Sequence, residues 1–510
     1  MEVFTNTPKV QKSRKMTLEL LLSVHDRKCL SCKRSGTCEL QKLCNDMGID
    51  SENRYEGAVP AGKKDYSTLH LERDNAKCIL CRRCVAACKA NQAVGVIGAN
   101  ERGFSTHIGC AFEAPLGDSP CVSCGQCITV CPTGALTEKD DTAKVWAALR
   151  DPSKHVVVQP APSVRATLGE CFGMPIGTNV EGKMVAALRR LGFDGVFDTD
   201  TAADFTIMEE ATEFVQRVKN GGTLPLITSC SPGWVKFCET YYPDMIPNLS
   251  SCKSPQQMFG ALTKTYYAEK MGLDPHDIVC VSVMPCTAKK FEIGRDDMSA
   301  AGDNIPDVDI SITTRELGRM IERAGIKFTE LPDEDFDPAL GESTGAATIF
   351  GATGGVMEAA LRTSYSIVTG KNPKPDAFSN VRGMDGWKEA EFKLGGTVLK
   401  TAVASGLGNT RKLINALQKG DVSYDFVEIM ACPGGCAGGG GQPIHDGKEL
   451  AEQRSSKLYA MDQKNAVRFS HENEEVKELY HNYFGKPGSH LAHKLLHTDH
   501  NGWDMPFGGK

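Results

Sequence analysis

The sequence predicts a large α/β domain with mostly parallel sheets, preceded by two small cysteine-rich modules. Apolar β-rich runs such as His155–Ala161 and Ile278–Cys286 alternate with helical patterns such as Thr206–Asn220. This alternation is typical of buried parallel strands joined by helices. Ahead of this region, cysteines recur in closely spaced groups. We therefore divide the chain into segments 1–75, 76–150, 151–454 and 455–510.

Composition and charge exclude several classes of protein. The chain has 510 residues, a length typical of about three domains, and a net charge of −6. This charge, without a basic arm, argues against nucleic acid or an anionic membrane as a partner. The start lacks a signal peptide and no run of 18 apolar residues follows, so a cytoplasmic protein is expected. The 21 cysteines are clustered, which in a long chain without an export signal favours metal ligands over disulfides.

The first module, residues 1–75, carries a short histidine and cysteine motif. A helix is expected over about Lys15 to Val24, and the motif His25-x3-Cys29-x2-Cys32-x5-Cys38 follows. This spacing suits either a zinc site or an iron–sulfur cluster with one imidazole ligand. The neighbouring segment favours electron transfer, and Cys44 is an alternative to His25 as the fourth ligand. A neutral imidazole in place of a thiolate raises a cluster's reduction potential.

Residues 76–150 contain one cysteine pattern twice, 43 positions apart. The first copy is Cys78-x2-Cys81-x2-Cys84-x3-Cys88, and the second is Cys121-x2-Cys124-x2-Cys127-x3-Cys131 followed by proline. This is the pattern of two-cluster bacterial ferredoxins, an α+β fold in which the fourth cysteine of each run ligates the other cluster. One 4Fe–4S cluster is therefore assigned to Cys78, Cys81, Cys84 and Cys131. The other is assigned to Cys121, Cys124, Cys127 and Cys88. Cys110 fits neither run and is interpreted as a small buried hydrophobe.

Two cysteines of the α/β segment, Cys230 and Cys286, follow predicted strands, where open α/β sheets place their sites. Glu210 and Glu213 lie one turn apart on a predicted helix and are expected to face the same channel. The run GATGGV at 351–356 lacks the Gly-Lys-Ser/Thr ending of a phosphate-binding loop.

Three segments carry a family resemblance: Thr228–Trp234 (TSCSPGW), Met284–Glu292 (MPCTAKKFE) and Met430–Pro443 (MACPGGCAGGGGQP). In this order, downstream of a ferredoxin module, they resemble the signature motifs of iron-only hydrogenases across essentially the whole chain. The resemblance implies the iron-only hydrogenase fold and an H-cluster. In such a centre a cysteine sulfur joins a 4Fe–4S cube to a diiron unit with carbon monoxide, cyanide and dithiolate ligands. The tail 455–510 resembles the family's small subunit, fused on as one or two helices.

The resemblance also implies roles for individual residues. Cys286, Cys432 and Cys436 match cube ligands, and Cys436 matches the bridge to the diiron unit. Lys289 matches the contact to one cyanide, and Pro162 and Ser163 match contacts to the other. Gln256, Gly354 and Gly355 match further polar contacts, and Met284 and Met430 match the apolar groups flanking the diiron unit. A proton relay is implied from metal to surface in the order Cys230, Glu210, Ser250, Glu213, Arg217. For the N-terminal cluster, the resemblance favours His25 over Cys44.

The sequence departs from the family pattern in two places. The first motif commonly reads Cys-Cys, a relay cysteine followed by a cube ligand, whereas here it reads Cys230-Ser231. Either Ser231 binds iron through oxygen, or Cys230 ligates and the serine becomes a poorer relay. Larger family members also carry a plant-type 2Fe–2S domain ahead of the stretch resembling Val10–Leu21, whereas here only about ten residues precede that stretch. Either this form lacks that domain, or the chain is shortened at Met1.

The leading hypothesis is a hydrogenase that exchanges electrons with ferredoxin or with flavin- and NAD(P)-binding subunits, and whose diiron unit comes from maturation proteins. A hydrogen or redox sensor on the same fold is the alternative, since a weakened relay suits it. A non-catalytic iron–sulfur scaffold is a third class. The cysteines of the third motif, Lys289 and the paired glutamates argue against it.

Overall fold

The computed structural model describes residues 1–49, 54–57, 64–445 and 447–501. Contacts divide the chain into two compact units. The smaller unit comprises Met1–Cys121, Gly125–Lys139 and Ile444–Lys448, and the larger unit comprises Val122–Cys124, Asp140–Pro443 and Glu449–Lys510.

The N-terminal part of the smaller unit contains helices α1 (Pro8–Ser23) and α2 (Glu39–Asp46). Helix α1 begins seven residues before the expected start at Lys15. Its start is fixed by the side chain of Thr7, which accepts a hydrogen bond from the Val10 amide, and by Pro8 in the first turn. Because of this cap, the helix begins before the residues that carry the amphipathic pattern.

The remainder of the smaller unit is built from short elements around the duplicated cysteine runs. Strands β1 (Lys64–Asp65), β2 (Leu71–Asp74) and β5 (Leu136–Glu138) form an antiparallel sheet, and β3 (Gly98–Asn100) pairs with β4 (His107–Gly109). Helices α3 (Arg83–Ala86) and α4 (Gln126–Thr129) each begin inside one cysteine run and contact each other. Cys110 is 2% exposed, so the interpretation as a buried hydrophobe is confirmed.

The larger unit contains two four-stranded sheets, the first of which is entirely parallel. Its order is β10-β9-β6-β7, with β6 His155–Pro160, β7 Gly195–Val196, β9 Ile278–Met284 and β10 Ile310–Thr313. Helices α5 (Thr142–Arg150), α6 (Glu181–Leu191) and α12 (Thr314–Arg323) pack beside it. Val145 of α5 belongs to the core formed with Val156 and Val281, so this helix is part of the larger unit.

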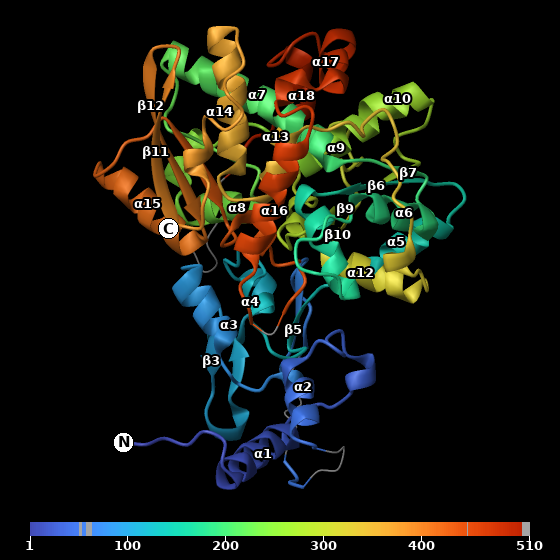
Figure 1. Cartoon of the computed structure of the whole chain (residues 1–510), viewed down its shortest axis with the longest axis vertical. Helices are drawn as coiled ribbons and strands as arrows, with labels where there is room; N and C mark the ends of the chain where they lie inside the picture. The colour runs from blue at the N-terminus through green and yellow to red at the C-terminus, as the bar shows by residue number, and fades with distance from the viewer. Residues whose placement is uncertain (50–53, 58–63, 446, 502–510) are drawn as a thin grey trace. The chain divides into compact units, whose positions relative to one another are not determined.

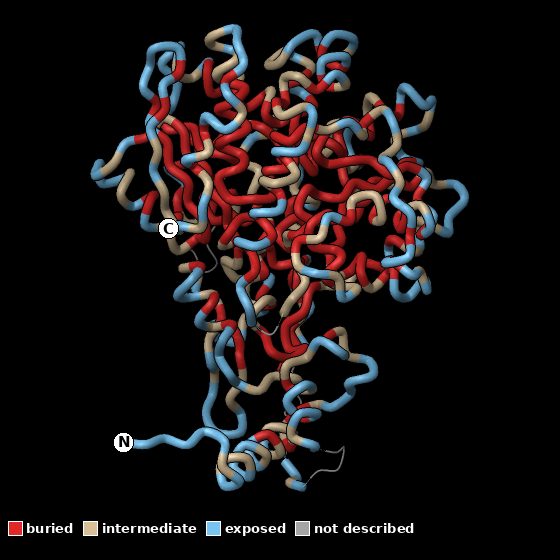
Figure 2. The backbone as a smooth tube through the Cα atoms, in the orientation of Figure 1, coloured by how far each residue is buried: buried red, intermediate tan, exposed pale blue. Residues whose placement is uncertain are grey.

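The second sheet has the order β11-β12-β13-β8, with β8 Leu226–Ile227, β11 Trp387–Leu394, β12 Thr397–Ser405 and β13 Phe426–Met430. The strands β12, β13 and β8 are parallel, whereas β11 pairs with β12 as an antiparallel edge hairpin. Helix α7 (Thr199–Asn220) contacts α14 (Gly355–Thr369), and α15 (Leu407–Lys419) contacts β12 (Figure 1). The parallel strands of both sheets run through the buried interior (Figure 2), as continuous apolar strands predict.

Short helices join the strands: α8 (Pro232–Tyr241), α9 (Pro255–Leu262), α10 (Ala268–Met271), α11 (Lys289–Glu292) and α13 (Gly345–Thr348). The tail forms α16 (Ala451–Lys464), α17 (Glu474–Leu479) and α18 (His490–Leu496). The sequence predicted one or two helices here, and the structure has three. Asn473 and Ser489 cap the last two helices and so divide the tail. Arg362 of α14 fixes α16 through two hydrogen bonds to the carboxylate of Asp462, both side chains being fully buried. Among the described residues, no helix combines the length and apolarity needed to cross a membrane.

Candidate active site

Four parallel strands of the larger unit end beside one buried cavity. Strands β6 and β9 lead into Pro162 and Cys286, and strands β8 and β13 lead into Cys230 and Cys432; all four residues line it. The carboxyl ends of parallel strands are where α/β sheets place binding sites. The non-atom space at this site, open solvent included, is about 700 Å³.

Cys286, Cys432 and Cys436 line this cavity together, although they come from loops far apart in the chain. A hydrogen bond between the side chains of Cys286 and Cys432 lowers the pKa of the Cys286 thiol. Burial raises the pKa of the Cys436 thiol to about 12. A free thiolate is therefore unfavourable at Cys436, and a metal charge is what would stabilise it. The site has the character expected of metal ligands.

The backbone of the third motif turns tightly between Cys432 and Cys436. Gly434 and Gly435 have φ angles of +75° and +74°, a conformation that favours glycine. A Cβ atom on Gly435 would also lie 2.7 Å from the amide nitrogen of Thr353. The two glycines therefore let both cysteines of the motif reach the same cavity.

Lys289 is held by a buried carboxylate that sequence reasoning did not single out. The carboxylate of Glu292 is 4% exposed and its Oε2 accepts hydrogen bonds from Lys289 Nζ (2.9 Å), Gln256 Nε2 (2.8 Å) and Ser254 Oγ (2.9 Å). Lys289 Nζ also donates to the carbonyl of Cys230, at 3.2 Å. Glu292 thus positions two cavity-lining residues, Lys289 and Gln256.

The remaining residues matched to the cofactor divide into those that line the cavity and those that do not. Pro162, Met284 and Met430 line it. Ser163 is fully buried and accepts a hydrogen bond from Gln442 Nε2 at 3.1 Å.

The structure does not bring Gly354 and Gly355 to the cavity lining, which instead includes Phe350 and Gly351. The Gly354 amide donates to Glu428 at 2.7 Å, and the Gly355 amide donates to the carbonyl of Ala352 at 3.1 Å. Both amides are therefore engaged inside the protein. Glu428, a second carboxylate missed from the sequence, also accepts from the Met357 amide, and burial raises its pKa to about 7.

Three of the residues matched to the relay, Ser250, Glu213 and Arg217, are joined by hydrogen bonds. Ser250 Oγ donates to Glu213 Oε2 at 2.9 Å, and Arg217 donates to Glu213 Oε1 at 2.6 Å. Glu210 is 1% exposed, and its Oε2 has no hydrogen-bond partner. The two glutamates face the same interior, as their spacing on α7 predicts.

The two residues at the inner end of the proposed relay, Glu210 and Cys230, both have raised pKa values. Burial, reinforced by the charge of Glu213, raises the pKa of the Glu210 carboxyl from 4.5 to about 8, although Ser250 and Arg217 oppose the shift. Burial also raises the pKa of the Cys230 thiol well above its usual value, and Glu210 contributes to that shift. Glu210 is thus suited to exchanging a proton near neutral pH.

Both residues of the departing motif line the cavity, Cys230 and Ser231. Ser231 Oγ accepts a hydrogen bond from the Ala431 amide at 3.2 Å, which ties the first motif to the third. Each residue therefore lies at the lining of the same cavity as Cys286, Cys432 and Cys436.

In the smaller unit, the four cysteines assigned to the first ferredoxin cluster surround one small cavity. Cys78, Cys81, Cys84 and Cys131 all line it, although Cys131 comes from the second run. For the second cluster, Cys88, Cys121 and Cys127 pack against one hydrophobic cluster of the smaller unit. Cys124 belongs to the larger unit.

The first module contains a buried histidine and cysteines with shifted pKa values. The Nδ1 atom of His25 is buried without a hydrogen-bond partner, and burial lowers the pKa of this imidazole. A neutral buried ring with an unpaired nitrogen fits a metal ligand. Burial raises the pKa of the Cys38 thiol, with a smaller contribution from Cys32. Burial also raises the pKa of the Cys44 thiol, with smaller contributions from Cys38 and Cys29.

Within the larger unit, Cys432 Sγ lies 3.9 Å from the carbonyl oxygen of Cys124. The loop carrying Cys124 is also held by Thr287, which donates to the carbonyl of Ser123 at 2.8 Å. A ligand predicted for a ferredoxin cluster thus contacts a ligand predicted for the buried cube.

Family comparisons cover most of the chain. Residues 154–440 match the family described as iron only hydrogenase large subunit, C-terminal domain, and residues 448–503 match the iron hydrogenase small subunit. Residues 14–53 match the iron–sulfur binding region of NADH-ubiquinone oxidoreductase-G, and residues 77–135 match the 4Fe-4S dicluster domain.

Individual relatives agree with the family match. The NADP-reducing hydrogenase subunit HndD of Solidesulfovibrio fructosivorans is 52% identical over 98% of this chain and 86% of that protein. Iron hydrogenase 1 of Clostridium pasteurianum is 45% identical over 98% of this chain and 87% of that protein. The solved structure of an apo FeFe-hydrogenase from Chlamydomonas reinhardtii matches with a TM-score of 0.65 and 44% identity, over 71% of this chain and 99% of that one. The chain therefore belongs to the iron-only hydrogenases, enzymes that work at an H-cluster and carry iron–sulfur domains for electron relay.

Proposed function

We propose that this hydrogenase holds the cube of its H-cluster through Cys286, Cys432 and Cys436, with Cys436 bridging to the diiron unit. The observation that carries the proposal is the convergence of these three sulfurs with Lys289 on one buried cavity. The fourth cube ligand comes from Cys230 or Ser231, which line the same cavity.

The donor set of the cavity fits the rest of the centre. Lys289 brings a buried cation, and cyanide is an anionic acceptor that a buried ammonium group stabilises. Pro162 and Ser163 would contact the second cyanide. Met284 and Met430 give the cavity apolar walls and exclude water. Glu292 fixes the Lys289 ammonium group and the Gln256 amide.

When bound, the H-cluster supplies the redox chemistry that converts two protons and two electrons into H2 and back. The protein moves the protons. Arg217 holds Glu213 near the surface, and Ser250 passes a proton between Glu213 and Glu210. Glu210, with a pKa of about 8, then exchanges it with the Cys230 thiol, which faces the cavity. A group whose pKa lies near the working pH transfers protons efficiently in both directions.

Electrons follow a separate route through three 4Fe–4S clusters. The ligands proposed are His25, Cys29, Cys32 and Cys38 for the first. Each ferredoxin cluster takes three cysteines of one run and the fourth of the other run. His25 is preferred to Cys44 because its buried Nδ1 has no other partner. The contact between Cys124 and Cys432 supports entry of electrons into the H-cluster from the second ferredoxin cluster.

We further propose that the partners are ferredoxin or flavin- and NAD(P)-binding subunits. The support is the 52% identity to a protein named as an NADP-reducing hydrogenase subunit. The match of residues 14–53 to an NADH-ubiquinone oxidoreductase region is consistent with it.

Infrared spectroscopy of the anaerobically matured protein tests the ligand assignment. The wild-type protein should show carbon monoxide and cyanide bands together with H2 turnover. Cys436→Ala should lose the bands, because the bridging sulfur is gone. Cys280→Ala is the matched control, since Cys280 is a buried cysteine of β9 outside the cavity lining. Bands retained in Cys436→Ala would contradict the assignment.

The relay is tested separately with Glu213→Gln. This variant should keep the infrared bands while turnover falls by about 10²-fold, the lower end of what positioned proton transfer contributes. Bands together with negligible turnover in the wild-type protein would instead favour a hydrogen sensor.

A further inference from the structure

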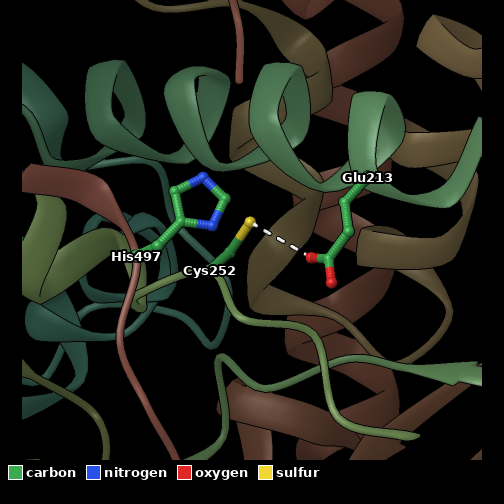
Figure 3. Close-up of side chains that lie close together, drawn as sticks. All are labelled: Glu213, Cys252 and His497. Atoms are coloured by element: carbon green, nitrogen blue, oxygen red, sulfur yellow. Dashed lines mark hydrogen bonds between the residues drawn. The ribbon is translucent and has the colours of Figure 1, made fainter. Parts of the chain in front are cut away.

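Three side chains that differ in chemistry meet beside the outer end of the proposed relay. Glu213 of α7, Cys252 and His497 point toward one another (Figure 3), and one ligand atom of each lies within 4.8 Å of the others. Cys252 Sγ lies 3.8 Å from Glu213 Oε2. The backbones of Cys252 and His497 pair in an isolated antiparallel bridge, so these two side chains are held in register.

The imidazole of His497 is oriented by a carboxylate behind it. Its Nε2 lies 3.0 Å from Glu209 Oε2. Glu209 also accepts hydrogen bonds from the Tyr480 hydroxyl (2.6 Å) and the Gly488 amide (2.8 Å). Because an ionised carboxylate only accepts hydrogen bonds, Nε2 carries the ring proton and neutral His497 has its lone pair on Nδ1. A carboxylate that holds the distal nitrogen in this way is the usual support of a metal-bound histidine.

The Nδ1 atom of His497 has a hydrogen-bond partner that is easily displaced, the hydroxyl of Ser251. It lies 2.8 Å from the hydroxyl of Ser251, which can rotate away or itself offer an oxygen. Glu213 turns its Oε2 atom toward the same site, where this oxygen also accepts hydrogen bonds from Ser250 Oγ (2.9 Å) and the Ser251 amide (3.2 Å). Arg217 binds Oε1, whereas Oε2 is the atom that approaches Cys252 and Ser250.

We propose that Glu213 Oε2, Cys252 Sγ and His497 Nδ1 form a binding site for one divalent zinc-like cation, which no comparison assigns to this chain. Carboxylate, thiolate and imidazole are the three ligand types that Zn²⁺ takes, with a fourth position left for water or a hydroxyl. Tetrahedral coordination at about 2.0–2.3 Å requires the three ligand atoms to close in by up to about 1.5 Å, which side-chain rotation achieves.

The charge of the pocket favours such a cation. With its acidic groups ionised, the cluster has negative charges on Glu209, Glu213 and Cys252, opposed by the single positive charge of Arg217. A divalent cation neutralises the difference. In its absence, burial and the neighbouring glutamates raise the pKa of the Cys252 thiol well above its usual value. A bound metal reverses this preference, because a coordinating thiol is deprotonated.

Occupancy of this site would regulate the relay, an effect that rests on the relay proposed above. The cation takes Glu213 Oε2, the atom that accepts the hydrogen bond from Ser250. Proton exchange between Glu213 and Ser250 is then interrupted while the H-cluster is untouched.

X-ray absorption at the zinc edge tests the site in the holoenzyme, whose cluster cysteines are already occupied by iron. With one equivalent of zinc chloride, the wild-type protein should show one sulfur neighbour at about 2.3 Å and lighter neighbours at about 2.0 Å. Cys252→Ala should lose the sulfur neighbour, and His497→Gln should bind zinc more weakly. Cys238→Ala, a buried cysteine of α8 elsewhere in the unit, is the matched control and should retain it. A zinc spectrum without sulfur, or sulfur retained in Cys252→Ala, would overturn the proposal.

Turnover measured on the same samples separates the site from the relay. One equivalent of zinc should lower H2 turnover about tenfold or more in the wild-type protein, because the relay contributes about 10²–10⁴-fold. It should have little effect in Cys252→Ala. Zinc bound through sulfur with unchanged turnover would support the site and contradict proton transfer through Glu213.

Discussion

Replacing Glu210 by glutamine tests the buried end of the relay. The pKa of this carboxyl rises from 4.5 to about 8, mainly through burial. At about 1.4 kcal/mol per unit, this shift corresponds to a cost of about 5 kcal/mol for the ionised form. Because the folded-state pKa lies above the unfolded value, the folded protein binds this proton more tightly. The cost is absent below about pH 4.5, grows as the pH rises toward 8, and is complete above that.

Glutamine has the shape of the neutral acid but carries no titratable proton. We expect Glu210→Gln to lower H2 turnover by about 10²-fold or more at all pH values. Its unfolding midpoint should match the wild-type protein near pH 4.5 and exceed it increasingly as the pH approaches 9. In infrared difference spectra, the wild-type protein should show a protonated carboxyl band that disappears through about pH 8, consistent with the raised pKa.

Glu428→Gln is the matched control, because burial raises the pKa of Glu428 to about 7. It should remove a band that titrates near pH 7 and leave the one near pH 8. Unchanged turnover in Glu210→Gln, or persistence there of the band near pH 8, would refute the role of this carboxyl.

Three further predictions concern the clusters and the tail. Ser231→Cys supplies a softer iron ligand than the serine oxygen, which favours the more reduced iron, and should raise the reduction potential of the cube in an EPR titration; an unchanged potential would assign the ligand role to Cys230. His25→Cys replaces a neutral ligand with an anionic one and should lower the potential of the N-terminal cluster, while Cys44→Ala should leave it unchanged; the reverse pattern would make Cys44 the ligand. Arg362→Met removes one of the two arginines that pair with each of the buried carboxylates Glu358 and Asp462, while Arg382 and Arg468 stay in place. It should lower the free energy of unfolding by about 1.5–3 kcal/mol, the range for hydrogen bonds to charged groups, measured by thermal denaturation; a wild-type midpoint would show that the ion pair adds no net stability.

The grouping of candidate metal ligands in the first ferredoxin run could be predicted from sequence because cysteine spacing within a tight loop is itself the chemical signal. The grouping of Cys78, Cys81 and Cys84 with the distant Cys131 around one cavity follows from the duplicated pattern alone. The parallel pairing of β6 and β9 could also be predicted, since both strands are largely apolar runs.

The supporting carboxylates could not be predicted in this way. Glu292 lies in a four-residue helix and Glu428 in the middle of a buried strand, where a single acidic residue gives no periodic signal. Their importance appears only when burial and donor geometry are known, because a buried carboxylate is tolerated where donors surround it. The same applies to Gly354, whose amide is taken by Glu428.

The region that matches a small subunit is continuous with the rest of the polypeptide in this protein. Its residues Tyr480 and His497 hold Glu209 of α7 in the larger unit. Covalent attachment turns their docking into a unimolecular event, with an effective concentration that dilution does not change. Specific activity should therefore stay constant as the enzyme is diluted, without any dissociation of a second chain to weaken the hydrogen bonds around Glu209.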